Sequence, residues 1–386
     1  MNGNKNITIA YICDTNYLLD SRPQKEVNSL LNNGYNVSFI GWDRSQNGRL
    51  KKDTFSLNDN QLLITKICSK GKFGGSVKEM LFALIKYEFK LLYWLIKNRH
   101  KYDVIHACNF NTGYIANKCA RLLKKKLIYD IYDFYVDSHP YTSKNKFIHN
   151  LIRNMDINVI NKADTTIICS EKRKEQIKGA SPKKLIVLHN TPPKYSVNVI
   201  ENYTIKGNDK VKIAYVGSIT CERPIRELAD IVSKNSSLEL HCGGFGPDAK
   251  YIEEIAERNN NIFFYGEMTY AATLYLESQC DILPALYDPK IANHQYAAPN
   301  KFYEALMLGK PLIMIKNTGM DDMVTKYDIG EVTENTIEGI ENAILRLIDR
   351  RSEWDAIGSR MKLLYDEKFS WDEMERRLIA LYDDID

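Results

Sequence analysis

The chain has 386 residues, of which 44% are hydrophobic and 26% are charged, values that exclude a disordered or fibrous protein. This length is too great for one compact core and suits two domains. The formal net charge of +4 conceals an asymmetry, because residues 1–190 carry a net charge of +15 and residues 191–386 carry −11. The basic half favours an anionic partner, either a membrane surface or a nucleic acid.

The eight cysteines form no C-x-x-C pair, and several lie within apolar runs. This pattern favours buried free thiols in a reducing compartment over a disulfide framework or a zinc site. The first apolar run, Ile7–Cys13, is too short for a signal peptide, and no run of about 18 uncharged apolar residues follows. We therefore expect a cytoplasmic protein without a membrane-spanning helix.

Residues 1–193 are expected to form a first α/β domain. Short apolar runs alternate there with helical patterns, as is typical of strands buried on both faces of a parallel sheet. These runs are Ile7–Cys13, Asn36–Gly41, Val104–Ala107, Lys126–Asp130, Thr165–Cys169 and Leu185–His189.

Residues 194–371 are expected to form a second α/β domain, because the polar segment from Asn190 to Asp209 lacks periodicity and resembles a linker. Its expected strands are Val211–Val216, Leu238–Cys242, Ile262–Tyr265, Asp281–Leu286 and Pro311–Ile315. The tandem arrangement predicts two Rossmann-like domains that face each other across a ligand-binding cleft.

The most informative segment is A-P-N-K-F-Y-E-A-L-M-L-G-K-P, residues 298–311. Pro299 suits the first turn of a helix, and it places Asn300 and Lys301 beside unpaired backbone N–H groups that favour an anion. Glu304 lies on the same face one turn deeper, where its carboxylate can accept hydrogen bonds from a ribose diol. An amphipathic helix with a surface Lys–Glu pair explains the spacing equally well.

This segment resembles the donor-binding motif of the retaining glycosyltransferases of family 4, which have the GT-B fold. That family usually carries two glutamates with seven residues between them. Glu304 matches the second, whereas Tyr296 stands at the position of the first, as in a subgroup with a P-N-K-x-x-E form. The resemblance implies that Tyr296, Pro299, Asn300, Lys301 and Glu304 bind the donor.

Two glycine-containing segments extend the resemblance. Tyr215–Pro224 resembles the family's strand and basic loop, in which Gly217 allows close backbone approach and Arg223 contacts the donor diphosphate. Gly243–Pro247, with Gly244 at its centre, resembles the turn near the nucleotide base. Neither segment follows the G-x-G-x-x-G spacing, so an NAD-dependent dehydrogenase is disfavoured.

The first domain carries weaker signals. Asp20–Glu26 resembles the family's first helix and makes Arg22 an acceptor-side candidate, although a solvated helix start is the simpler reading. Tyr102–Ala107 and Tyr129–Asp133 resemble strands that end at the active site. The resemblance implies that Asp133, Tyr132 and His106 are catalytic candidates, although His106 also suits a structural role. In this fold a C-terminal helix, here residues 372–386, crosses back onto the first domain.

The segment from Gly71 to Lys101 bears on the nature of the acceptor, because it combines a broad apolar surface with lysines and aromatic residues. Lys86, Lys90 and Trp94 suit an anionic membrane surface, and we expect peripheral attachment to the inner face of the cell membrane. A buried helix with snorkelling lysines is the alternative. Nucleic acid is disfavoured, because no recognised binding motif accompanies the charge.

The resemblance implies transfer of a sugar from a nucleoside-diphosphate sugar, with retention, to a glycan or lipid-linked acceptor in capsule, O-antigen or similar polysaccharide synthesis. No cofactor or metal is expected, because Arg223, Lys301 and the helix N-terminus can stabilise the departing diphosphate. Two alternatives stay open: a nucleotide-sugar 2-epimerase of the same fold, and a non-catalytic nucleotide-binding subunit of a membrane complex.

Overall fold

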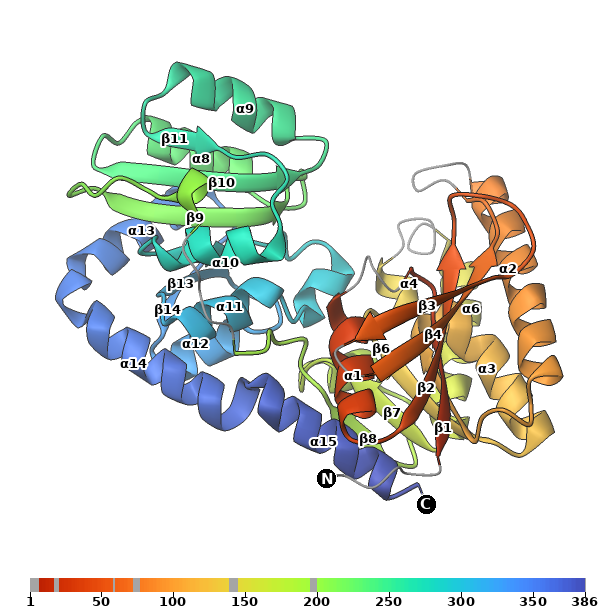
Figure 1. Cartoon of the computed structure of the whole chain (residues 1–386). Helices are drawn as coiled ribbons and strands as arrows, with labels where there is room; N and C mark the ends of the chain where they lie inside the picture. The colour runs from red at the N-terminus through yellow and green to blue at the C-terminus, as the bar shows by residue number, and fades with distance from the viewer. Residues whose placement is uncertain are drawn as a thin grey trace. The chain divides into compact units, whose positions relative to one another are not determined.

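The computed structural model describes residues 7–16, 21–57, 60–71, 77–138, 145–194 and 200–385. The chain divides into two compact units (Figure 1). Unit 1 comprises Met1–His189 and Met374–Asp386, and unit 2 comprises Asn190–Glu373. The boundaries expected from the sequence were 193/194 and 371/372.

Unit 1 is built on one eight-stranded sheet with the order β3-β4-β2-β1-β5-β6-β7-β8. Its strands are β1 (Thr8–Cys13), β2 (Asn36–Asp43), β3 (Lys51–Leu57), β4 (Asn60–Cys68), β5 (Val104–Cys108), β6 (Lys126–Ile131), β7 (Thr165–Ile168) and β8 (Leu185–Val187). All pairings are parallel except that of β3 with β4. The apolar runs of the sequence therefore mark the buried central strands.

The antiparallel pair β3–β4 was not predicted from the sequence. Residues 51–56 of β3 are all exposed, because this strand forms the edge of the sheet. Its lysines and polar side chains are typical of protected edges and resemble a loop. In β4 the buried Leu62 and Ile64 flank the exposed Leu63, an alternation that does indicate a strand.

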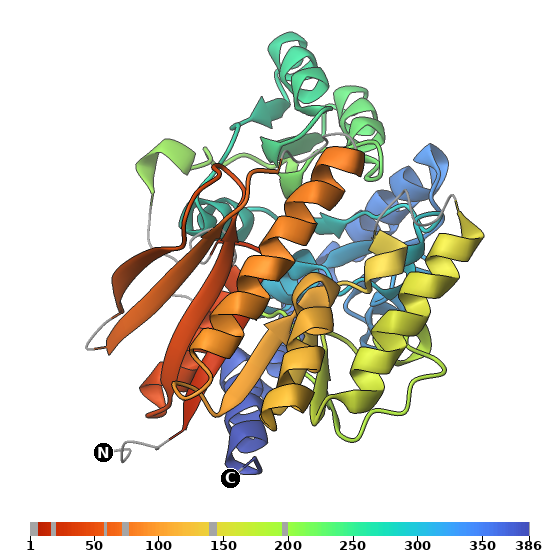
Figure 2. The same ribbon diagram turned by 90° about the vertical axis from the view of Figure 1, so that its right-hand side faces the viewer.

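Helices cover both faces of this sheet. They are α1 (Ser21–Asn32), α2 (Val77–Lys97), α3 (Asn109–Leu123), α4 (Tyr135–Ser138), α6 (Lys146–Lys162), α7 (Arg173–Gln176) and α15 (Trp371–Asp383). α2, α3 and α6 run side by side over one face (Figure 2). α1 and the end of α15 lie on the other face, where Glu26 and Tyr382 approach His106 of β5.

Helix α15 belongs mainly to unit 1, since the unit includes Met374–Asp386. Its residues are tied there by hydrogen bonds from Asn33 to Glu375 (2.8 Å) and from Tyr35 to Asp383 (2.7 Å). Tyr382 is fully buried. The C-terminal helix therefore packs on the first unit, as the sequence predicted.

Unit 2 contains two three-stranded parallel sheets, with the orders β11-β10-β9 and β12-β13-β14. The strands are β9 (Val211–Ser218), β10 (Leu238–Phe245), β11 (Ile262–Phe264), β12 (Leu283–Ala285), β13 (Leu312–Ile315) and β14 (Gly330–Thr333). A parallel bridge between Ile213 and Ile282 joins β9 to the start of β12. The combined strand order, β11-β10-β9-β12-β13-β14, is that of a Rossmann fold. Successive strands are added on one side up to β11 and on the other side from β12 onward, so the strand order reverses between β9 and β12. The last strand, β14, was not predicted.

The helices of unit 2 are α8 (Ile225–Ser233), α9 (Ala249–Arg258), α10 (Tyr270–Ser278), α11 (Asn300–Leu308), α12 (Asp321–Tyr327), α13 (Ile337–Asp349) and α14 (Trp354–Leu364). Their apolar faces pack against the sheet in two clusters of buried side chains. Both units are thus Rossmann-like, as expected from the sequence. None of the helices that the structure describes has both the length and the apolarity needed to cross a bilayer.

Candidate donor and acceptor sites

The predicted donor motif forms the start of α11 in unit 2. The helix begins at Asn300, directly after Pro299, and ends at Gly309, whose φ of 69° closes it in the left-handed conformation. Its N-cap residue, Pro299, makes no side-chain hydrogen bond to the first turn. The N-terminal N–H groups of α11 therefore keep their capacity to bind an anion. The side chain of Asn300 is exposed and accepts a hydrogen bond from Asn190 at 2.9 Å.

Lys301 is buried and turns its ammonium group toward two carboxylates. Its Nζ lies 2.9 Å from Oε1 of Glu277 and 3.9 Å from Oε2 of Glu304. Burial alone would lower the pKa of Lys301, but Glu277 and Glu304 outweigh it and raise this pKa above its usual value. The sequence predicted that this ammonium binds the donor diphosphate. In the structure it instead forms an ion triad with Glu277 and Glu304.

Glu304 and Glu277 are also buried. Burial raises the pKa of the Glu277 carboxyl to about 7, against the lowering effect of Lys301. Burial raises the pKa of the Tyr270 phenol on α10, and the neighbouring Glu304 carboxylate raises it further. Both Glu277 and Tyr270 were missed from the sequence. The sequence does contain an indication of Glu277, because it is the only carboxylate of α10 and its neighbours in that helix are apolar or small.

A glycine arch lies beside the triad. We use this name for Gly217, at the end of β9, and Gly244, at the end of β10, which are partners in the strand register. A Cβ on Gly244, whose φ is 130°, would lie only 1.8 Å from the carbonyl oxygen of Gly217. A Cβ on Gly217 would lie 3.7 Å from Cε of Lys301. The lack of a side chain at both glycines therefore allows the ends of β9 and β10 and the aliphatic part of Lys301 to lie close together.

Arg223 lies in the loop after β9. Its guanidinium sits 4.1 Å from the centre of the Tyr287 ring. Burial would lower the pKa of Arg223, but the phenols of Tyr287 and Tyr215 raise it, so the side chain stays a cation. Tyr215 in turn lies 5.1 Å from Nζ of Lys301. Tyr215 therefore interacts electrostatically both with Arg223 and with Lys301 of the triad.

Tyr296, which takes the place of the family's first glutamate, is half-buried at the end of a short 3-10 helix, Ala292–Tyr296. Gly319 packs beneath its backbone, since a Cβ there would lie 2.9 Å from the Tyr296 carbonyl carbon. All eight predicted donor residues lie in unit 2. Gly217, Gly244, Lys301 and Glu304 form one connected group, while Tyr296, Pro299 and Asn300 lead into α11.

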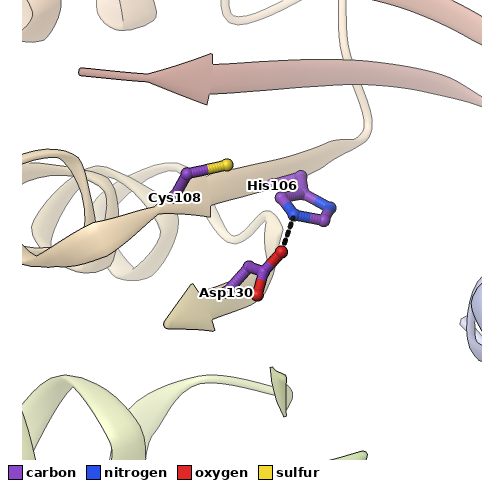
Figure 3. Close-up of side chains that lie close together, drawn as sticks. All are labelled: His106, Cys108 and Asp130. Carbon is purple, nitrogen blue, oxygen red and sulfur yellow. Dashed lines mark ion pairs between the residues drawn. The ribbon is translucent and has the colours of Figure 1, made fainter. Parts of the chain in front are cut away.

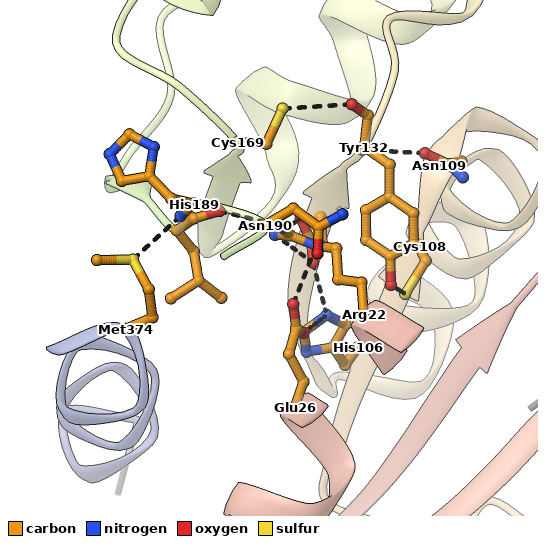
Figure 4. A network of polar contacts seen from close by, with 12 residues as sticks. Arg22, Glu26, His106, Cys108, Asn109, Tyr132, Cys169, His189, Asn190 and Met374 are labelled. Atoms are coloured by element: carbon orange, nitrogen blue, oxygen red, sulfur yellow. Dashed lines mark hydrogen bonds and ion pairs between the residues drawn. The ribbon is translucent and has the colours of Figure 1, made fainter. Parts of the chain in front are cut away.

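In unit 1, Arg22 lies at the centre of a buried polar network (Figure 4). Its guanidinium donates to both oxygens of Asp130, at 3.0 and 3.1 Å, and to the carbonyl of Leu188 at 2.9 Å. Its Nε lies 3.0 Å from Glu26. Only 2% of Arg22 is exposed. In the structure Arg22 binds buried partners within unit 1, and its contact with an acceptor stays a prediction.

His106 is fully buried next to this network. Its Nδ1 lies 2.7 Å from the hydroxyl of Tyr382, and its ring stacks on Tyr11 with 4.3 Å between centroids. Burial lowers the pKa of His106 to about 4 and raises that of Glu26 to about 7. This burial favours the structural role that the sequence left open for His106, and a catalytic role for it stays a prediction.

Tyr132 and Asp133 follow β6 at the carboxyl edge of the sheet. The Tyr132 hydroxyl lies 3.1 Å from that of Tyr11 and donates to the sulfur of Cys108, also at 3.1 Å. The backbone N–H of Tyr132 donates to Asn109, a non-glycine residue with a φ of 63°. Asp133 is exposed and forms an ion pair of 2.8 Å with Arg173. Of the three catalytic candidates, Asp133 alone is exposed to solvent.

His106, Cys108 and Asp130 bring potential metal-ligand atoms within 4.8 Å of one another (Figure 3). Two features argue against a cation there. The Arg22 guanidinium already binds both oxygens of Asp130, and burial raises the pKa of the Cys108 thiol well above its usual value. A protonated thiol and a neighbouring positive charge suit a structural network better than a metal site.

Helix α2 carries the residues predicted to face a membrane. Trp94 does not, because it is 6% exposed and belongs to the core, where it stacks near Tyr102. Lys90 is turned back to the carbonyls of Gly48 and Cys68, at 2.8 and 2.5 Å. Lys86 is exposed and lies 4.3 Å from the ring of Phe82. The outward side of α2 is lined instead by the exposed apolar residues Leu81, Phe82, Ile85, Phe89, Tyr93 and Ile96.

Residues 210–350 match the family described as glycosyl transferases group 1. These residues contain the glycine arch, Arg223 and the triad. No curated protein sequence matches the chain. Unit 2 therefore contains a domain of the glycosyltransferase group 1 type.

Solved structures with the same fold extend over nearly the whole chain. A sucrose-phosphate synthase from Thermosynechococcus elongatus is 13% identical, with a TM-score of 0.74, and the match covers 98% of this chain and 99% of that one. HepE from Anabaena, in complex with UDP and glucose, is 12% identical, with a TM-score of 0.67 and coverage of 98% and 100%. WaaB, a lipopolysaccharide outer core galactosyltransferase, is 16% identical, with a TM-score of 0.63 and coverage of 97% and 100%.

Proposed function

We propose that the protein transfers a sugar from a nucleoside-diphosphate sugar to a glycan or lipid-linked acceptor during synthesis of a surface polysaccharide, with retention of configuration. The observation that carries this proposal is the position of Lys301, with its ion partner Glu304, at the glycine arch, next to the point where the strand order of unit 2 reverses. Ligands of open α/β sheets bind outside the carboxyl ends of the strands at such a point. The P-N-K-x-x-E form of the motif supports membership of a family 4 subgroup.

The donor fits the chemistry of these residues. Arg223 and the uncapped N-terminus of α11 supply positive charge for a diphosphate. Glu304 can accept hydrogen bonds from the ribose diol. The arch gives the nucleotide close access to the backbone. HepE, whose structure contains UDP and glucose, and the galactosyltransferase WaaB support a donor of this class.

Catalysis then consists mainly in stabilising the diphosphate as it leaves, and Arg223 and the α11 dipole act where that charge develops. No metal is required on this account. Retention follows if the acceptor attacks from the face that the diphosphate leaves, and a diphosphate oxygen takes the acceptor's proton. Asp133, an exposed carboxylate at the carboxyl edge of the sheet of unit 1, would bind hydroxyls of the acceptor.

The acceptor is proposed to be lipid-linked because of the outer face of α2. Its six exposed apolar side chains suit the interfacial region of a bilayer, and Lys86 and Lys97 beside them suit anionic headgroups. The protein would then work in the cytoplasm at the inner face of the cell membrane. Nucleic acid is not part of the proposal.

Thermal unfolding in the presence of UDP, GDP, ADP and their sugars tests the donor assignment, because a ligand that binds only the native state raises the melting temperature. The nucleotide sugar that binds is then assayed for hydrolysis and for transfer to lipid extracts. Glu304→Ala should abolish the stabilisation, and Glu253→Ala, at an exposed carboxylate of α9, should preserve it. If none of these compounds stabilises the wild type, the proposal fails.

A non-catalytic nucleotide-binding subunit is the second candidate. Tyr296 in place of the first glutamate and the burial of His106 favour it. Tight nucleotide binding without hydrolysis or transfer for any donor would support this reading. Inversion of the sugar of a UDP-sugar at C2, without an acceptor, would instead indicate a 2-epimerase.

A further inference from the structure

We propose that Tyr270 and Glu277 of α10 are positioning residues of the donor site, which hold Glu304 and Lys301 so that the Glu304 carboxylate is preset for the ribose diol. The inference rests on the proposed function and deepens it. It also assigns Lys301 a different task from that of a diphosphate ligand.

Helix α10 contacts both charged side chains of the α11 motif. Tyr270 in its first turn lies near enough to Glu304 for that carboxylate to raise the pKa of the phenol, and Glu277 near its end accepts a hydrogen bond of 2.9 Å from Lys301. Positions 270 and 277 are seven residues apart, about two turns, and so lie on the same face of α10. One helix therefore fixes both ends of the motif.

The charges of this group select hydroxyls over phosphate. One ammonium, on Lys301, is shared by two buried carboxylates, at 2.9 and 3.9 Å. Above about pH 7, where Glu277 has lost its proton, the triad therefore keeps one net negative charge. A second anion next to it would be repelled, whereas O–H donors would relieve the charge. Arg223 and the α11 N-terminus are thereby left as the diphosphate ligands.

One oxygen of Glu277 supports a role beyond simple ion pairing. Among the residues that the structure describes, its Oε2 has no hydrogen-bond partner, although Glu277 is only 1% exposed. An unpaired acceptor on a buried carboxylate costs free energy. Its presence therefore indicates that the site needs Glu277 in this position. Here Glu277 holds the Lys301 ammonium beside Glu304, so Lys301 can orient the carboxylate that meets the ligand.

The test compares the affinity of isosteric variants for UDP, GDP and ADP and for their 2′-deoxy counterparts, measured by calorimetry on the full chain. Wild type should prefer the ribonucleotide that it binds over its 2′-deoxy form. Glu277→Gln and Tyr270→Phe should each lose about tenfold in ribonucleotide affinity and little in deoxynucleotide affinity. A residue that only stabilises the fold would affect both equally.

Two controls keep the outcome decisive. Tyr251→Phe removes a comparable phenol–carboxylate bond, the 2.6 Å contact with Asp230, elsewhere in unit 2 and should leave both affinities unchanged. Lys301→Met should reduce the ribose preference but keep the preference for diphosphate over monophosphate, which Arg223→Gln should lose. Circular dichroism and thermal unfolding confirm that each variant is folded.

The failure of this inference differs from the failure of the proposed function. If wild type binds none of the nucleotides, the proposed function is wrong. If wild type binds and Glu277→Gln and Tyr270→Phe keep the full ribose preference, or if Lys301→Met loses the diphosphate preference, the positioning role is wrong.

Discussion

Arg22 donates two hydrogen bonds to the carboxylate of Asp130, which lies 108 residues further along the chain. The pair joins α1 to the end of β6 and is completed by Glu26, one turn further along α1. All three side chains are almost inaccessible to solvent. This network therefore couples the first helix of unit 1 to the edge of the sheet that carries Tyr132 and Asp133.

Replacing Arg22 by methionine should destabilise the protein by about 3–5 kcal/mol, because it leaves buried carboxylates without their cation. Equilibrium unfolding in urea measures this change. The matched control is Lys183→Met, which removes a surface ion pair of 3.1 Å with Asp164 and should cost less than about 1 kcal/mol. Equal losses in the two variants would contradict a stabilising role for Arg22.

The stability contributed by Glu26 should depend on pH. Burial raises its pKa from 4.5 to about 7, so the folded protein binds this proton more tightly than the unfolded chain does. The contribution is full below pH 4.5 and is lost as the pH rises to about 7. The advantage of wild type over Glu26→Gln should shrink by up to about 3 kcal/mol across this range. Urea unfolding of both proteins at a series of pH values gives the difference.

His106 should show the opposite dependence. Burial lowers its pKa from 6.5 to about 4, so its contribution is present above pH 6.5 and is lost as the pH falls toward 4. In the same unfolding series, the advantage of wild type over His106→Gln should therefore grow as the pH rises. A parallel change for Glu26→Gln and His106→Gln would show that one of the two protonation states has been assigned wrongly.

Removing the charge of Arg223 should weaken donor binding. Arg223→Gln is expected to raise the dissociation constant of the bound nucleoside diphosphate by about 10- to 100-fold, because a charged hydrogen bond is lost. Calorimetry with UDP, GDP and ADP measures it. The control is Arg226→Gln, three residues further on, where the half-exposed guanidinium pairs with Asp248 at 3.2 Å. Comparable losses at both positions would point to a nonspecific effect of charge.

Gly244→Ala should disrupt the glycine arch. The added Cβ would lie 1.8 Å from the Gly217 carbonyl oxygen, and the φ of 130° strains any residue with a side chain. We expect a loss of stability of about 2–4 kcal/mol, together with loss of nucleotide binding. Thermal unfolding with and without nucleotide reports both. Gly207→Ala, where an added Cβ meets no atom within 4 Å, should change neither.

The outer face of α2 predicts binding to anionic membranes. Phe89→Asp, at a side chain that is 69% exposed, should reduce cosedimentation with vesicles of phosphatidylglycerol and phosphatidylethanolamine, because it places a charge in the apolar face. Ile337→Asp, at an exposed apolar residue of α13 in unit 2, should bind as wild type does. Wild type that stays in the supernatant would exclude α2 as a membrane anchor.

Much of the fold could be predicted from the sequence because buried parallel strands carry a strong local pattern. The apolar runs located the central strands of both units, and Pro299 and Gly309 bounded α11 within a residue. The edge strand β3 could not be found in this way, since its side chains are exposed and polar. The sequence showed that α2 is amphipathic, but it did not show which side of the helix faces the sheet. Trp94 was therefore predicted to face a membrane, although it lies in the core.

The two Rossmann-like units and the segment of unit 2 that carries the donor motif could be located from the sequence, because periodicity, helix ends and glycine positions are local properties. The partners of Arg22, His106 and Lys301 became apparent only in the folded chain. These partners, Asp130, Tyr382 and Glu277, lie far from them in the sequence. Burial and pairing are set by packing, and a local sequence pattern contains no record of which partner a side chain will meet.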